Sequence, residues 1–289
     1  KRDARLEKEK ETAKSGGDNF YPSEEALREE DRENDPTIVF TIRDAAGKVV
    51  SKFTEKPKKG VNRSSWNMRY GSMSAIQMKK EESDNPFAGQ DYGALAFPGK
   101  YSVEMTLVQG SELKALAGPI EFQLKALDNM SMPMAEPQSL AEFKEEVKEA
   151  KRKVVFTNKK VGDLSERMKF MRQAILSHQR ADISWLADLT KQQELLDDQK
   201  LKLYGDGSLS KREFETAPSI NGRIGLVTYN LWSHRSNPTG TQRVNIQIAT
   251  EELLELEKSL ETIETSIAKM EEKMAANGVP YTPGRDETE

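Results

Sequence analysis

Apolar side chains recur at alternating steps of three and four residues over two long stretches of the chain. The first follows Ser139 and contains one polar exception, Thr157, and the second runs from about Thr241 to Asn277-Gly278. This spacing predicts two long helices, each with one apolar seam of the coiled-coil type, and the first would be about 55 Å long. The seam positions are Leu140, Phe143, Val147, Ala150, Val154, Thr157, Val161, Leu164, Met168, Met171 and Ile175 in the first helix, and Ile246, Ala249, Leu253, Leu256, Leu260, Ile263, Ile267, Met270 and Met274 in the second.

Two shorter helices are predicted between the long ones, the first ending at Gly205 and the second beginning near Pro218-Ser219. A long helix with one apolar seam is not stable alone in water, so the shorter helices are expected to supply a third wall. This predicts an antiparallel helical bundle over residues 139–278, followed by a tail over 279–289. A second chain could supply the missing wall instead, which would give a dimer. The apolar positions of the shorter helices are Leu186, Leu189, Leu196 and Leu203, then Ile220, Ile224, Val227 and Leu231.

Residues 36–127 show the two-residue alternation of β-strands instead. Residues 37–42 (TIVFTI) and 48–53 (KVVSKF) flank the turn sequence DAAG and predict a hairpin. Residues 64–70 place Ser64, Trp66, Met68 and Tyr70 on one face, which predicts a strand with Trp66 in the core. With the alternating segments near Tyr101 and residues 120–124, this gives five or six strands and a β-sandwich.

The predicted fold class is therefore α+β: an antiparallel β-sandwich followed by a long antiparallel helical bundle. Residues 1–35 are expected to be a charged tether in which Ser23 can cap a short helix. Residues 71–97 are expected to be a long loop, and residues 128–138 a linker between the two domains.

The composition of the chain argues against several kinds of binding partner and against sites that depend on cysteine. Residues 1–35 hold 8 basic and 12 acidic residues, and this segment alone accounts for the net charge of −4. The remainder is neutral and has no basic stripe, so neither nucleic acid nor an anionic membrane is an expected partner. The chain has no Cys, which removes disulfides and Cys-ligated metals. No apolar run approaches the ~18–20 residues of a membrane span, so no direct membrane insertion is expected.

No pattern of catalytic or ligand-binding residues is present. Neither His178 nor His234 is paired in sequence with a nucleophile or a carboxylate. Residues 204–215 (YGDGSLSKREFE) imitate part of a calcium loop, but with Gly207 at the sixth loop position Lys202 and Tyr204 take two ligand positions. The sequence thus predicts no catalytic residue, no metal site and no cofactor, and we do not expect this region to be an enzyme.

The segment least explained by packing is residues 217–243 (APSINGRIGLVTYNLWSHRSNPTGTQR). It combines aromatic and arginine side chains with Gly and Pro, a mixture typical of interface anchors. It therefore predicts a partner-contact surface, although Trp232 could instead hold together a corner of the bundle. The candidate contact residues are Arg223, Tyr229, Trp232, Arg235 and Arg243.

Three motifs resemble the Ig-like module of flagellar hook-capping proteins and of many secreted bacterial proteins. They are IRDAAGKVVSKF with its D-x-x-G-x-V hairpin, KGVNRSSWNMRY with a Trp after a Gly, and FPGKYSVEM. The order of all segments, including FYPSEEALREEDREND, WSHRSNPTGTQR and GVPYTPGR, is similar to the C-terminal region of bacterial sortilin-like BNR/β-propeller proteins, often labelled glycosyl hydrolases.

The second resemblance implies a β-propeller that precedes these elements and carries any enzymatic label, and the propeller's Asp-box motifs do not occur here. It also implies export to the periplasm or cell surface, in a bacterium of the Bacteroidota type. The implied partners are the chain's own or a separate β-propeller polypeptide, or an outer-membrane or periplasmic protein complex.

The leading functional hypothesis is a non-catalytic accessory region that docks onto such a partner. One alternative is a substrate-access region of an exported hydrolase whose active site lies in the propeller. Another is a self-associating coiled-coil spacer.

Overall fold

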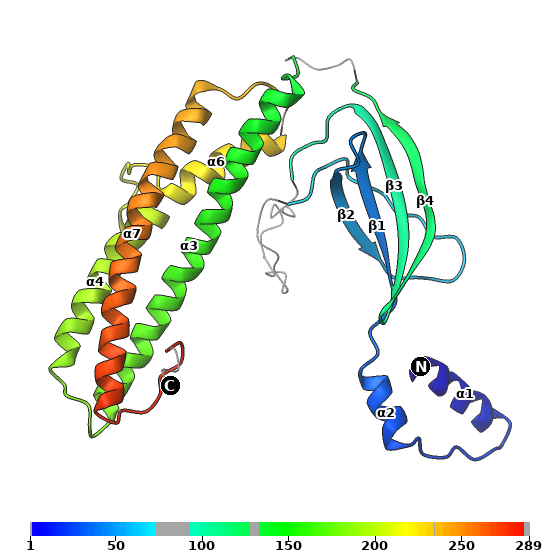
Figure 1. The fold of residues 1–289 in the computed structure, drawn as a ribbon, viewed down its shortest axis with the longest axis horizontal. Helices are drawn as coiled ribbons and strands as arrows, with labels where there is room; N and C mark the ends of the chain where they lie inside the picture. Colours follow the sequence, from blue (N-terminus) through cyan, green and yellow to red (C-terminus); the bar gives the residue numbers. More distant parts are fainter. Residues whose placement is uncertain (1, 73–92, 128–132, 234, 286–289) are drawn as a thin grey trace. The chain divides into compact units, whose positions relative to one another are not determined.

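The computed structural model describes residues 2–72, 93–127, 133–233 and 235–285 (Figure 1). The predicted loop over 71–97 lies outside these residues for 73–92, as do residues 128–132 of the predicted linker and His234. The chain is mixed α+β and divides into two compact units, Lys1–Gly71 with Ala96–Asp128, and Ser72–Leu95 with Asn129–Glu289. We refer to them as the sheet unit and the helical unit.

The N-terminal segment of the sheet unit consists of two short helices, α1 (Arg2–Lys14) and α2 (Glu24–Asp31). Ser23 caps α2, as the sequence predicts, because its side chain accepts a hydrogen bond from the backbone N–H of Ala26. Arg5 on α1 donates to both carboxylate oxygens of Glu30 on α2, at 2.6 and 2.8 Å. The segment predicted to be a tether therefore has a local fold of its own.

Four strands form one antiparallel sheet in the order β2-β1-β3-β4 (Figure 1). They are β1 (Thr37–Asp44), β2 (Val49–Glu55), β3 (Gly99–Gln109) and β4 (Glu112–Leu124). The predicted hairpin over 37–53 is confirmed, and its turn is held by Asp44, whose Oδ1 accepts from the N–H groups of Ala46 and Lys48.

Residues 64–70 do not form the predicted strand, so the described residues contain four strands in one sheet rather than five or six. Met68 has φ 58°, in the left-handed region, which interrupts the alternation of side chains that a strand requires. Trp66 nevertheless lies in the core, as predicted. Its ring packs against Tyr101 at 5.5 Å and Phe122 at 6.1 Å between centroids, and its indole N–H donates to the carbonyl of Arg69 at 3.0 Å.

One face of the sheet carries the core of this unit. Paired strand positions share a face, so Ile42 and Tyr101, with their neighbours on β3 and β4, point to the same side. Trp66, Tyr70 and Ala96 cover this side from the irregular segments. The buried members are Ile42, Val50, Ala96 and Tyr101, and the partly buried members are Phe53, Trp66, Tyr70, Val103, Phe122 and Leu124.

The helical unit contains two long helices, α3 (Pro137–Ser177) and α7 (Gly240–Ala276), and three shorter ones. The shorter helices are α4 (Trp185–Tyr204), the single turn α5 (Gly207–Ser210) and α6 (Ile220–Ser233). The helices α3, α4, α6 and α7 all contact one another, as Figure 1 shows for the two long helices.

The long helices run parallel to each other, because Lys160 pairs with Glu264 and Arg167 with Glu271, at a constant offset along both helices. Helix α4 turns back along α3 after the short connection over residues 178–184. Helix α6 continues in the same direction, from the Asn221–Asn158 contact to the hydrogen bond between Arg235 and Ala135. The predicted antiparallel relation therefore holds between the long helices and the shorter ones, and not between α3 and α7.

The predicted seams account for most of the core of this unit. All eleven seam positions of α3 are buried, and so are the four of α6. On α7 the structure departs from the pattern, because Glu271 is buried where Met270 was expected. On α4 the buried aromatic residue is Trp185, which the predicted stripe did not include, while the predicted Leu186 is only partly buried.

Residues 279–284 of the predicted tail fold back onto the helical unit. The N–H of Val279 donates to the carbonyl of Met274, and both Val279 and Thr282 are buried. Gly284 lies against the side chain of Arg167 on α3, where a Cβ would come within 2.6 Å. Residues 279–284 therefore belong to the packed helical unit.

Candidate protein-interaction surface

Residues 217–250 contain no acidic residue, although the chain has 48 of them. Their charged residues are Arg223, Arg235 and Arg243. This stretch includes α6 and the first turns of α7, so one part of the helical unit is apolar and weakly basic. The rest of α3 and α7 is densely charged, as is usual for the solvent-facing side of a helix.

Helix α6 is apolar on both its inner and its outer side. Its inner positions, Ile220, Ile224, Val227 and Leu231, pack in the core. Its outer positions are exposed, and Arg223 is the single charged residue of the helix. Polar residues, among them Asn221, Thr228 and Asn230, lie between these two sides, so the outer side is a separate exposed apolar strip. We define the α6 surface as Gly222, Gly225, Leu226, Tyr229 and Trp232.

The exposed apolar area of the α6 surface comes mainly from two side chains. Leu226 is 54% exposed and Tyr229 is 64% exposed. A Cβ built on Gly225 would meet nothing within 4 Å, so this part of the helix leaves its backbone open to a close approach. The surface combines a shallow glycine stretch with two projecting apolar groups.

Tyr229 and Trp232 are neighbours on α6 and stack on each other, with 6.0 Å between ring centroids and 24° between ring planes. Trp232 is partly buried, whereas the other face of Tyr229 is open to solvent. Trp232 therefore packs against Tyr229 near the end of α6, and the expectation that it contacts a partner stays a prediction.

The three candidate arginines do not form one cluster. Arg223 lies on the α7 side of α6, where its Nη1 donates to Asn245 at 2.8 Å, and its buried Nε has no hydrogen-bond partner. Arg243 lies over the ring of Phe143 at 5.1 Å and lines a groove between α3 and α7. Arg223 therefore flanks the α6 surface, whereas Arg243 belongs to the α3–α7 junction.

Arg235 follows α6 and lies beside Lys144 of α3, a residue that the sequence analysis did not select. Burial of Lys144, together with the nearby charge of Arg235, lowers the pKa of the lysine to about 8. Sequence reasoning also missed Leu226 and the two glycines. The signal that could have found them is the absence of acidic residues over 217–250.

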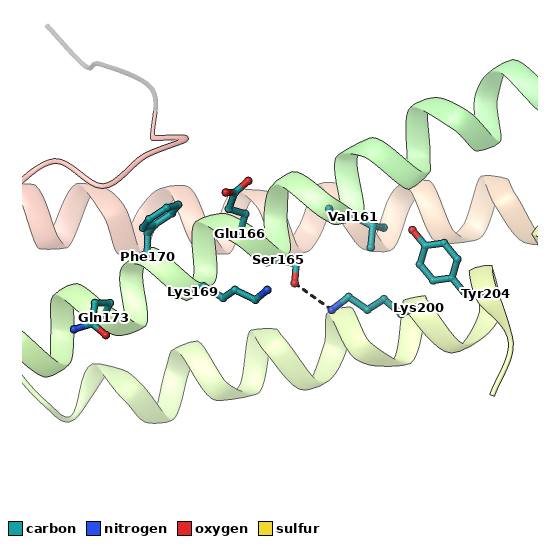
Figure 2. A pocket seen from close by; sticks show the side chains of 9 residues that line it. Val161, Ser165, Glu166, Lys169, Phe170, Gln173, Lys200 and Tyr204 are labelled. Atoms are coloured by element: carbon teal, nitrogen blue, oxygen red, sulfur yellow. Dashed lines mark hydrogen bonds between the residues drawn. The ribbon is translucent and has the colours of Figure 1, made fainter. Parts of the chain in front are cut away.

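A separate groove of about 630 Å³ lies between α3 and α4 (Figure 2). Its most chemically suggestive contact is between the ammonium of Lys200 and the hydroxyl oxygen of Ser165, at 3.3 Å. The same ammonium also donates to the Asp197 carboxylate at 2.8 Å, so the lysine is the hydrogen-bond donor in both contacts. A charged ammonium has no lone pair with which to take the serine proton, so this contact does not activate Ser165.

Within the described residues, no group of three or more His, Asp or Glu side chains is placed to hold a metal ion. None of the described helices is long and apolar enough to cross a bilayer. No protein-family model, no curated protein and no solved structure matches this chain.

Proposed function

We propose that this chain is a non-catalytic accessory region of an exported bacterial β-propeller protein, and that it docks onto the propeller or a cell-envelope partner through the α6 surface. The observation that carries the proposal is a helix with a single charged residue that exposes Leu226 and Tyr229 to solvent. Contiguous exposed apolar groups on an otherwise charged protein are typical of interaction sites.

The energetic argument is that covering these groups favours association. Full burial of a large apolar side chain contributes about 1.5–3 kcal/mol, and Leu226 and Tyr229 each have about half of their area still to bury. Tyr229 is also held against Trp232 before any partner binds, so little side-chain entropy is lost on docking. Aromatic anchors of this kind dominate many protein interfaces.

The sheet unit enters the proposal as an Ig-like module, by its resemblance to modules of secreted bacterial proteins. The hairpin around Asp44 and the packing of Trp66 against Tyr101 and Phe122 support that assignment. Location in the periplasm or at the cell surface is part of the same proposal and rests on the resemblance alone.

The spacer hypothesis receives less support from the packing of the long helices. Leu256 and Leu260 are fully buried within a single chain, so their seam does not require a second copy. Substituting either residue with Asp would therefore unfold the helical unit rather than separate a dimer.

The test is capture of partners from envelope extracts of the source organism, with matched variants of the full chain as bait. Leu226→Glu is compared with Leu254→Glu on α7, because Leu254 is 46% exposed and lies outside the α6 surface. We expect the same protein to be recovered by the wild type and by Leu254→Glu and to be lost with Leu226→Glu and Trp232→Ala. Binding of that protein, once purified, should show the same order of affinities. Equal recovery by Leu226→Glu and Leu254→Glu would refute docking through α6.

A further inference from the structure

A second surface with complementary chemistry lies in the N-terminal segment of the chain. Residues 18–31 (DNFYPSEEALREED) contain six acidic residues and one basic residue. Phe20 and Tyr21 precede α2 and are 88% and 89% exposed, the highest exposure of any aromatic side chain in the described part of the chain. The segment therefore presents two adjacent aromatic rings beside an acidic helix.

The local fold of this segment ties down the backbone on either side of the two rings. Asn19 donates from Nδ2 to the carbonyl of Glu9 on α1, at 2.9 Å, and Glu30 at the other end is held by Arg5. Ser23 caps α2 between these two points. Because the backbone around Phe20 and Tyr21 is tied down on both sides, less entropy is lost when the rings bind.

The α6 surface offers the matching partner. Arg223 flanks this surface, which lies in a stretch with no acidic residue, whereas residues 18–31 carry a net charge of −5. Leu226 and Tyr229 supply apolar contacts for the rings of Phe20 and Tyr21, and Gly225 leaves room for a close approach. Complementary charge around an apolar centre is the usual arrangement at protein interfaces.

We infer that residues 18–31 of one copy bind the α6 surface of a second copy. Each surface is exposed within its own unit, the N-terminal segment in the sheet unit and α6 in the helical unit. The inference rests on the α6 surface named in the proposed function, but it does not depend on the propeller or envelope partner proposed there. A propeller or envelope partner that binds α6 would have to displace the N-terminal segment, so self-association would keep the surface covered until the partner is present.

A polyanion such as RNA or an anionic membrane is the less favoured occupant. Arg243 lies over Phe143 away from the α6 surface, which leaves Arg223 as the cation that flanks it, whereas a phosphate backbone is bound by several cations. Exposed leucine and tyrosine side chains match aromatic rings better than they match a phosphate backbone.

The first measurement is sedimentation velocity of the full chain over a wide range of protein concentration. The wild type and Leu254→Glu should show an average mass that rises with concentration, whereas Leu226→Glu should remain monomeric. The double variant Phe20→Ala/Tyr21→Ala should also remain monomeric. Circular dichroism of each variant controls for folding, since all four substituted positions are exposed. A wild-type mass that does not change with concentration would overturn the inference.

A mixing experiment then tests which surfaces meet. The Phe20→Ala/Tyr21→Ala chain keeps an intact α6 surface, and the Leu226→Glu chain keeps an intact N-terminal segment. Each is expected to be monomeric alone, but an equimolar mixture should form a complex with one intact contact. A mixture that stays monomeric would contradict contact between these two surfaces.

A labelled peptide of residues 18–31 provides the direct probe. It should bind the Phe20→Ala/Tyr21→Ala chain, and a peptide with Glu24→Gln and Glu25→Gln should bind at least about tenfold more weakly, as should the original peptide at high salt. Absence of peptide binding would refute the inference, as would Leu226-dependent binding of oligo-RNA or phosphatidylserine vesicles in its place.

The inference and the proposed function can fail separately. If the Phe20→Ala/Tyr21→Ala chain still captures an envelope partner through Leu226 but never self-associates, the proposed function stands and the inference is wrong. If the peptide binds and no envelope partner depends on Leu226, the inference stands alone.

Discussion

Substituting Glu271 with Gln should destabilise the helical unit far more than substituting an exposed glutamate of the same helix. Glu271 and Arg167 form a two-bond ion pair, with Nη2–Oε2 at 2.6 Å and Nε–Oε1 at 3.3 Å. Their side chains are only 4% and 12% exposed. Removing the negative charge would leave the buried guanidinium beside a neutral amide.

The expected loss is about 3 kcal/mol, at the lower end of what breaking a buried ion pair costs, because the amide introduced by Glu271→Gln would still accept one hydrogen bond. For a domain of this size that corresponds to a fall of about 6–12 °C in the midpoint of thermal unfolding. Replacing both partners by apolar residues, in Arg167→Met/Glu271→Leu, should recover most of the loss, since neither charge then remains unpaired.

The assay is thermal and urea unfolding of the full chain, followed by circular dichroism at the helical minimum. The matched control is Glu264→Gln, which breaks the Lys160–Glu264 pair between the same two helices. The side chains of Lys160 and Glu264 are 24% and 42% exposed, so Glu264→Gln should lower the free energy of unfolding by less than about 1 kcal/mol. If Glu271→Gln costs no more than Glu264→Gln, the assignment of Glu271 as a buried ion-pair partner is incorrect.

Three further predictions test other parts of the structure. The pKa of Lys144 is lowered to about 8 in the folded chain, against 10.5 for an ordinary lysine. Between these two values the unfolded chain keeps the ammonium proton and the folded chain loses it, so the free energy of unfolding should rise with pH over this range. Measured against Lys144→Met, which removes the titrating group and its coupling to Arg235, the rise should reach at most about 3 kcal/mol, and a flat difference would contradict the burial of the amine. Trp66→Ala should cost the sheet unit about 3 kcal/mol, seen as faster amide exchange in β1 and β3 with no change in α3 or α7. Gly162→Ala should raise the unfolding free energy by up to about 1 kcal/mol because its Cβ would meet open space on α3, whereas Gly118→Ala should lower it, since φ is +104° and the Cβ would lie 2.5 Å from a β3 carbonyl oxygen.

Local patterns in the sequence predicted most of the elements correctly. The three–four spacing identified every buried seam position of α3, because the period of a helix and the width of its buried stripe are properties of consecutive residues. The hairpin around Asp44 and the cap at Ser23 were equally predictable, since each depends on hydrogen bonds between residues a few positions apart. The acid-free stretch over 217–250 was also visible in the sequence, and it marks the part of the helical unit that contains the α6 surface.

Positions that depend on a neighbour from elsewhere in the chain were decided only by the tertiary structure. Glu271 replaces Met270 in the core because Arg167 of α3 lies opposite it, and a hydrophobicity pattern cannot show a partner that is 104 residues away. Trp66 packs against the core as predicted, but it lies in an irregular segment with a bend at Met68, which the alternation of side chains did not indicate.

The same distinction applies to the candidate contact residues. Arg223 and Arg243 are close in sequence but are separated in space because one contacts α7 and the other contacts α3. The sequence by itself determined most of the helices and strands, though not the irregular segment over residues 64–70, and which stretch lacks acidic side chains. The tertiary structure alone decided which apolar side chains of that stretch remain exposed, because burial depends on how the helices pack together and not on the order of residues within any one of them.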